Sequence, residues 1–342
     1  MSRRGAGRAA SALTLAALLV GCSSSGGTGG SAQPPPPVLS PAAEPQAAPT
    51  PGARPAGIVL PIGDTPEGVV VDDTTHLAVV ALRRPDQLAF VDLRTRAVRR
   101  IGVPGRARHL RLRQPGGPVL LPGEDSDVLA EIALPGGSVL SSEHTRRQPH
   151  DAVAAGGRVW VTDELAASVT ALGPGGATLP GPVQPGGLAA AGGRVAAADV
   201  RGNKLYVYDA ASLTQVAVLP AGEGPTHVVE AGGSKVLVAD SRGDAVLLYD
   251  LAGTPRMLDR LPLAGGPYGL GSDLRRSRVE VALSGRNLLV GVHVVGDKLR
   301  LDPAAPQPTV QQPNSVAVDE ATGHVVVAGA TADGLLQILD RG

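Results

Sequence analysis

Short apolar runs separated by turn residues fill most of this 342-residue chain. Residues 235–240 and 245–250, for example, are two apolar runs that each end in Asp, and the residues between them read Ser-Arg-Gly-Asp. Runs of this length are too short for helices, and turn-forming residues close them on both sides. The pattern therefore predicts β-strands joined by tight turns.

The same arrangement of strands recurs seven times, at a period near forty residues. Each unit starts at a proline or, once, at an alanine, and the starting residues are Pro66, Ala107, Pro149, Pro185, Pro225, Pro267 and Pro313. A period of this size with three or four strands per unit is typical of a β-propeller. Several strands are apolar at nearly every position, as in sheets that are covered on both faces. We therefore predict an all-β fold, a seven-bladed β-propeller with four antiparallel strands in each blade.

The last unit supplies only three strands, and one apolar run ahead of the first unit is left without a partner. That run, residues 57–61, reads Gly-Ile-Val-Leu-Pro. We predict that it completes the last blade as its fourth strand and so closes the ring. A closed ring leaves only short, protected strand edges.

The first residues have the features of a bacterial export signal. Three arginines precede an apolar run at residues 9–20, which is too short to cross a bilayer as a helix. The tetrapeptide Leu19-Val20-Gly21-Cys22 resembles the lipobox, at which the signal is cleaved and the Cys thiol is lipidated, and Cys22 is the only Cys of the chain. We predict a lipoprotein signal peptide at residues 1–21 and a lipid on Cys22. The alternative is an ordinary cleaved signal with an incidental Cys.

Lipid on Cys22 implies a protein held at the cell membrane on its extracytoplasmic face, with the export route, Sec or twin-arginine, left open. Residues 22–56 are rich in Ser and Gly and then in Pro and Ala, so they cannot bury enough apolar surface to fold. We expect them to form a disordered tether. Residues 57–342 then form the propeller.

Charge and motif content make several classes of protein poor candidates. The chain has 31 basic and 31 acidic side chains, a balance that leaves no footprint for nucleic acid. It also lacks the H-E-x-x-H, P-loop, G-x-S-x-G and paired-Cys motifs. We therefore assign no catalytic residue, metal or cofactor. We expect a monomer whose partners are the membrane, through its lipid, and an unknown envelope protein or ligand.

Candidate ligand-binding residues follow the start of each unit, because the inner strands of a propeller begin around one mouth of the central channel. These residues are Glu67, Arg108, His109, His150, Asp151, His227, Tyr268 and Asn314. Imidazole binds transition metals and titrates near neutral pH, so a metal site or an acid–base pair is one interpretation. Only His109, His150 and Asp151, from adjacent blades, are expected to converge, whereas His109 and His227 are expected nearly opposite each other. The other interpretation is a set of solvated side chains around the channel.

One Asp recurs at the end of the second strand in three neighbouring units, as Asp163, Asp199 and Asp240. A carboxylate at a strand end accepts hydrogen bonds from the backbone N–H groups of the turn that follows it. We predict this structural role for all three. A ring of carboxylates around a cation is the alternative.

The repeat resembles that of the YVTN-type, YncE-like seven-bladed propellers. The resemblance rests on residues 160–163 and 169–172 and on residues 238–240 and 246–250, and it extends over about residues 57–340. The chain departs from that family's pattern where the three recurring Asp residues replace the usual Asn. The resemblance implies an exported or envelope protein that binds ligands or partners on one face. We therefore expect a binding module, and the alternative is a metal-dependent enzyme of the lactonase or lyase kind at the same mouth.

Overall fold

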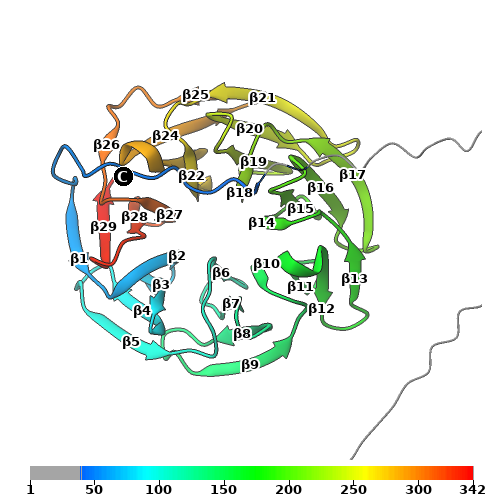
Figure 1. Ribbon diagram of the computed structural model, residues 1–342, viewed down its shortest axis with the longest axis horizontal. Coiled ribbons are helices and arrows are strands. Elements are labelled where there is room, and N and C mark those ends of the chain that lie inside the picture. Colours follow the sequence, from blue (N-terminus) through cyan, green and yellow to red (C-terminus); the bar gives the residue numbers. More distant parts are fainter. Residues whose placement is uncertain (1–38, 40, 342) are drawn as a thin grey trace, which may run out of the picture. The chain divides into compact units, whose positions relative to one another are not determined.

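The computed structural model describes residues 39 and 41–341, and in it the chain forms seven antiparallel sheets arranged around a central axis (Figure 1). The predicted all-β, seven-bladed fold is therefore confirmed. The predicted signal peptide and Cys22 lie outside the described residues, so lipidation stays a prediction. Within the described part of the chain, no helix has the length and apolar character needed to cross a membrane.

In the first four blades, successive strands of the chain lie side by side. Blade 1 holds β2 (Asp64–Asp72), β3 (Leu77–Arg84), β4 (Asp86–Asp92) and β5 (Val98–Gly102). Blade 2 holds β6 (Arg111–Leu112), β7 (Val119–Gly123), β8 (Val128–Ile132) and β9 (Val139–His144). Blade 3 holds β10 (Pro149–Ala155), β11 (Arg158–Asp163), β12 (Ser168–Leu172) and β13 (Ala177–Pro180). Blade 4 holds β14 (Pro185–Ala191), β15 (Arg194–Asp199), β16 (Lys204–Asp209) and β17 (Thr214–Pro220).

The remaining blades follow the same order, except that blade 6 has a fifth strand and blade 7 takes its outer strand from the N-terminal part of the chain. Blade 5 holds β18 (Pro225–Glu230), β19 (Lys235–Asp240), β20 (Ala245–Asp250) and β21 (Arg256–Pro262). Blade 6 holds β22 (Pro267–Asp273), β23 (Arg278–Leu283), β24 (Leu288–Val295), β25 (Lys298–Leu301) and β26 (Gln307–Pro308). Blade 7 holds β27 (Pro313–Asp319), β28 (His324–Gly329), β29 (Leu335–Asp340) and β1 (Ile58–Pro61). Three single 3₁₀ turns are described as well: η1 (Glu164–Ala166), η2 (Leu274–Arg276) and η3 (Ser284–Arg286).

Strand β1 closes the ring as the sequence predicts. It pairs antiparallel with β29, with Ile58 opposite Ile338 and Leu60 opposite Leu336. Blade 6 departs from the expected four strands because β24 is long, and its two ends pair with different segments, β25 and β26. The outer strand of that blade is therefore split into two short pieces.

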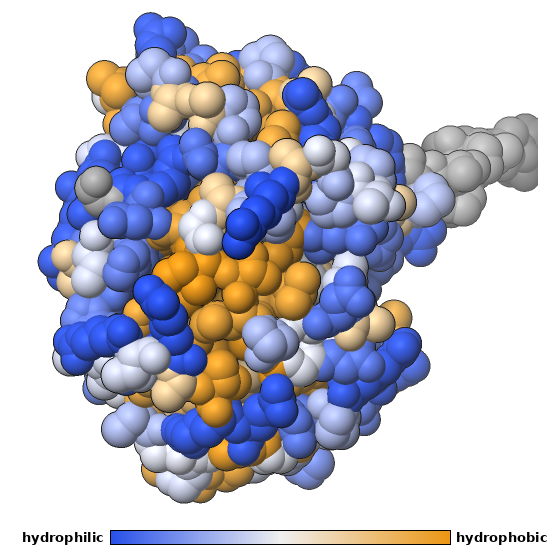
Figure 2. All heavy atoms as spheres, turned by 90° about the vertical axis from the view of Figure 1, so that its left-hand side faces the viewer, coloured by the Kyte–Doolittle hydropathy of each residue, from blue (hydrophilic) through white to orange (hydrophobic). Residues whose placement is uncertain are grey.

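The core lies between neighbouring blades and is built mainly from Val, Leu and Ala. Between blades 7 and 1, for example, Val326 and Ala328 belong to the same buried cluster as Val80 and Ala89. Each fully buried Val or Leu contributes about 1.5 to 3 kcal/mol relative to an exposed one. Apolar side chains also reach the surface on the flank that holds β1 (Figure 2), where three of the four residues of this strand are only partly buried.

The recurring Asp residues accept hydrogen bonds from turns and loops. Asp199 and Asp240 accept from the following turn, as predicted, whereas the backbone donor to Asp163 lies in the loop that precedes its blade. Asp199 accepts hydrogen bonds from the backbone N–H groups of Val183, Gln184 and Gly202 at 2.8 to 3.2 Å. Asp240 accepts in the same way from Glu223, Gly224 and Gly243, and Asp163 accepts from Arg146. Each carboxylate thus ties the end of the second strand to the loop that leads into its own blade.

The domain boundary expected at residue 57 is too late. The compact unit that contains the propeller begins at Leu39, and its chain from residue 41 crosses the ring face near the axis before it reaches β1 (Figure 1). Ring side chains hold this stretch, for example through the hydrogen bond of 2.8 Å from Arg242 to the carbonyl oxygen of Pro41. Its Pro- and Ala-rich composition predicted a free tether because composition does not reveal hydrogen bonds to an outside surface.

Candidate functional site

The candidate site is one mouth of the central channel, and a repeated irregularity of the inner strands forms it. In six blades the pairing of the inner strand with the next strand shifts directly after the starting proline. The shifts fall at Glu67, His150, Gly186, His227, Tyr268 and Asn314 or within one residue of them. A β-bulge re-aims side chains at a strand end. Most of the residues predicted for the mouth are therefore bulge residues.

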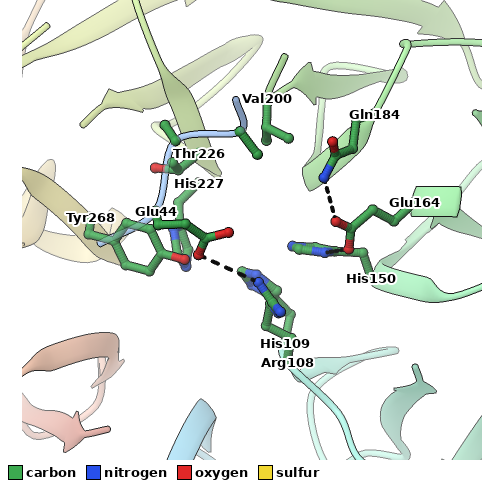
Figure 3. A pocket seen from close by; sticks show the side chains of 12 residues that line it. Glu44, Arg108, His109, His150, Glu164, Gln184, Val200, Thr226, His227 and Tyr268 are labelled. Atoms are coloured by element: carbon green, nitrogen blue, oxygen red, sulfur yellow. Dashed lines mark hydrogen bonds and ion pairs between the residues drawn. The ribbon is translucent and has the colours of Figure 1, made fainter. Parts of the chain in front are cut away.

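Five of the eight predicted residues line one small cavity at this mouth (Figure 3). They are Arg108, His109, His150, His227 and Tyr268. Four further residues of the blades line the cavity, namely Glu164, Gln184, Val200 and Thr226, and residues 42–44 complete the lining. The free volume of the cavity is about 20 Å³, enough for about one water molecule.

Three imidazoles and one phenol form a chain of ring contacts across the mouth. The ring centroids of His109 lie 4.9 Å from His150 and 4.6 Å from His227, and His227 lies 4.4 Å from Tyr268 in an edge-on contact. The expectation that His109 and His227 lie too far apart to meet is wrong. The inner strands approach one another so closely that a Cβ on Gly187 would lie 2.6 Å from the carbonyl oxygen of Thr226, so the channel is narrow.

Two of the buried imidazoles, His109 and His227, have lowered pKa values, which favours their neutral form. Burial lowers the pKa of His109, and the neighbouring His150 and the arginines Arg111 and Arg108 lower it further. Burial also lowers the pKa of His227, and His109 adds to the effect. Within the described residues, Nδ1 of His227 has no hydrogen-bond partner. Two neutral imidazoles thus form the floor of the mouth.

His150 forms the second part of the site together with Glu164, the first residue of η1. Nδ1 of His150 lies 2.8 Å from Oε2 of Glu164, and Gln184 donates to Oε1 at 2.6 Å (Figure 3). Burial alone would raise the pKa of Glu164, but the hydrogen bonds from His150 and Gln184 and the charge of Arg108 outweigh burial and lower it to about 2. Glu164 is therefore a carboxylate at any physiological pH.

Two arginines and two glutamates form the third part. Arg83 pairs with Glu67 at 3.4 Å and also with Glu124, while Nε of Arg108 donates to Glu124 at 2.9 Å. Burial raises the pKa of Glu67, against the opposing effect of Arg83 and Arg108. The mouth is therefore densely charged and internally paired.

Asp151 and Asn314 are set apart from the cavity. Asp151 is fully buried, and its carboxylate accepts from the backbone N–H groups of Ala152 and Leu188 at 2.9 and 3.0 Å. Oδ2 of Asp151 lies 3.8 Å from Nδ1 of His109. Of the three residues that were expected to converge, His109 is therefore the one that lies next to both His150 and Asp151. Asn314 accepts a hydrogen bond of 3.2 Å from Gln312.

Arg111 lies deeper in the channel and is a residue that the sequence did not single out. Its Nη2 donates to the carbonyl oxygens of Val228 at 2.9 Å and Leu188 at 3.3 Å and lies 3.4 Å from Asp151. One guanidinium thus links blades 2 to 5. The repeat did not predict this contact, because Arg111 lies in unit 2, the unit that starts at Ala107 instead of a proline.

One set of side chains in the described part of the chain has the spacing of a metal site. The ligand atoms of Glu124, His150 and Glu164 all lie within 4.8 Å of one another. Two carboxylates and one imidazole suit a divalent cation. However, Arg83 and Arg108 already pair with Glu124, so a cation has to compete with two guanidinium groups.

Comparison with known proteins identifies the class but not the family. Neither a family model nor a curated protein matches the sequence. A streptogramin B lyase structure is 11% identical and covers 84% of this chain and 97% of its own, with a TM-score of 0.68. Virginiamycin B lyase from Staphylococcus aureus is 12% identical and covers 83% and 98%, with a TM-score of 0.65. The RRP9 WD40 repeats are 14% identical and cover 85% and 99%, with a TM-score of 0.71. The chain is a seven-bladed β-propeller, and identities this low show the fold alone.

Proposed function

We propose that this protein is a binding propeller, anchored by a lipid on Cys22 to the extracytoplasmic face of the membrane, that recognises a protein or envelope ligand at the channel mouth. The observation that carries the proposal is the convergence of His109, His150, His227, Tyr268 and Arg108 on one cavity. Propellers among its structural neighbours include WD40 repeats, which supports an interaction role by analogy of fold.

Affinity capture tests this proposal. Immobilised protein is exposed to a detergent-solubilised envelope fraction, and the retained material is compared among variants. We expect Arg108→Ala and His150→Ala each to lower retention of the partner at least tenfold. The matched control is His144→Ala on the outer strand β9, because His144 is exposed and lies outside the cavity lining. Equal retention by all variants would remove the mouth from the interaction.

A second candidate function is a metal-dependent lyase-like reaction. The spacing of Glu124, His150 and Glu164 favours it, and two lyase structures share the fold. Melting of the purified protein with Mg²⁺, Ca²⁺, Mn²⁺ or Zn²⁺ separates the two functions. A rise in melting temperature at micromolar metal that Glu164→Gln abolishes supports the lyase-like function. No rise with any of these ions contradicts it.

A further inference from the structure

The chain ahead of the first strand lies on the channel mouth as an extended polypeptide. Residues 41–50 run from the axis across blades 6 and 7 (Figure 1) and contain no strand or helix of their own. Four hydrogen bonds join side chains of the ring to backbone atoms of this segment. They are Arg242 to the Pro41 oxygen (2.8 Å), Gln312 to the Gln46 oxygen (3.0 Å), the Ala48 N–H to Gln312 (2.9 Å) and Asn287 to the Pro49 oxygen (2.8 Å).

Gln312 binds this segment as a neighbouring strand would. Its amide nitrogen donates to the oxygen of Gln46 and its amide oxygen accepts from the N–H of Ala48. In an extended chain these two backbone groups point to the same side, and a primary amide presents the matching donor and acceptor. Asn287 is buried and holds Gln312 in place by accepting its backbone N–H at 2.9 Å. At Gln46 and Ala48 the ring therefore recognises the backbone of the segment.

Two side chains of the segment reach into the mouth. Ala43 is 8% exposed and lies in the cavity lining, and the Glu44 carboxylate lies 3.9 Å from Arg108 (Figure 3). Glu44 itself remains mostly exposed, with 66% of its side chain accessible. The segment thus supplies one small apolar side chain and one accessible carboxylate to the same pocket.

Three glycines of the ring leave space for the segment. A Cβ on Gly224 would lie 2.8 Å from the Cβ of Ala43, and one on Gly266 would lie 2.6 Å from the side chain of Gln46. A Cβ on Gly285 would lie 2.5 Å from the Gln46 side chain, while its nearest atom outside the segment is the Gly265 oxygen at 3.3 Å. The surface is therefore hollowed where the segment lies.

We infer that the channel mouth is a binding site for an extended, proline-rich polypeptide with one carboxylate, and that residues 41–50 occupy this site in cis. The inference rests on the proposed binding function and names its ligand class. Prolines at positions 41, 45 and 49 favour the extended form before binding, so little conformational freedom is lost. Because four hydrogen bonds, one small side chain and one exposed ion pair hold the segment, a partner segment of the same chemistry can displace it.

The experiment uses the whole chain with Cys22→Ser and with residues 41–50 replaced by ten Gly and Ser residues. The probe is a fluorescein-labelled peptide with the sequence of residues 39–51, followed by fluorescence anisotropy. We expect saturable binding to the replaced chain and at least tenfold weaker binding to the chain that keeps its own segment, because that segment competes at high local concentration. No binding to the replaced chain, with an unchanged melting temperature, overturns the inference.

Variants of the replaced chain test the recognition itself. Gln312→Ala and Gly285→Ala are expected to weaken peptide binding at least fivefold. Gly102→Ala is the matched control, because the space around Gly102 is free and its φ is not positive. A peptide with Glu44→Lys is expected to bind severalfold more weakly, and equal affinity overturns the carboxylate requirement. If the envelope partner is captured through the mouth but the peptide does not bind, this inference is wrong and the proposed function still holds.

Discussion

The hydrogen bond between His150 and Glu164 links the chemistry of the mouth to the stability of the ring. A carboxyl group whose pKa is lowered by folding stabilises the protein above its unfolded pKa, and this stabilisation is lost as the pH falls through the folded value. For Glu164 these limits are an ordinary value of 4.5 and a folded value of about 2. The stabilisation is therefore complete at neutral pH and disappears between about pH 5 and pH 2.

We expect Glu164→Gln to lower the free energy of unfolding at pH 7 by about 1 to 3 kcal/mol, because it removes a buried charged hydrogen-bond acceptor. Urea unfolding at pH 7 and at pH 3 measures the effect. The difference between the variant and the parent protein should shrink at the lower pH. An equal difference at both pH values would mean that the His150 contact does not hold the carboxylate charged.

The neutral imidazoles of His109 and His227 predict a second pH dependence. Their pKa values are lowered by burial, so below the ordinary value of 6.5 the unfolded chain binds protons that the folded chain does not. Stability should thus fall as the pH drops from 7 to 5, by up to about 1.4 kcal/mol per pH unit for each imidazole. His227→Gln should reduce this slope in urea unfolding, and an unchanged slope would contradict a neutral His227.

Strand β1 decides whether the ring behaves as one cooperative unit. It is the only described strand that joins the N-terminal part of the chain to the last blade, through its pairing with β29. We expect deletion of residues 57–61 to lower the free energy of unfolding by about 3 to 5 kcal/mol, because a strand pairing and its apolar contacts are lost. The urea transition should also broaden. Deletion of residues 24–28, in the predicted tether, is the equal-length control and should change neither quantity.

The elements that the sequence predicted well are those set by repetition. The unit spacing and the starting prolines predicted the inner strands, five of which begin at their starting proline in the structure. Unit 2 is the one that starts at an alanine, Ala107, instead of a proline, and its inner strand β6 is only two residues long. The split outer strand of blade 6 left no signal, because outer strands face solvent and lack the apolar pattern on which the prediction depends.

At the mouth, the sequence predicted the residues but not their contacts. The repeat predicted that His109, His150 and His227 lie at one end of the ring. That prediction needs only the order of the strands in each unit. Whether they meet depends on the width of the channel, which bulges and close backbone contacts at Gly187 determine. Glu164 and Arg111 were missed for a different reason. Each belongs to one blade only, so no repetition marked either of them.

On the scale of the whole molecule, the predicted anchor and the mouth are joined through one segment. Any chain that leads from Cys22 to the ring must pass residue 41, where the segment on the mouth begins. A pull on the anchor therefore acts first on residues 41–50 and only then on β1. We therefore expect the proposed lipid on Cys22 to couple membrane attachment to ligand access at the mouth.

The lipid itself is open to a direct test. Exported protein with a diacylglyceryl Cys22 should partition into the detergent phase of Triton X-114, since acyl chains add about 0.8 kcal/mol of membrane affinity per buried CH₂ group. Mass spectrometry of the N-terminal peptide should show a chain that begins at Cys22 with the added lipid. Cys22→Ser should remove both signals, while Ser24→Ala, the nearby control, should retain them. A mature chain with an unmodified Cys22 would leave the propeller without this anchor and free to diffuse after export.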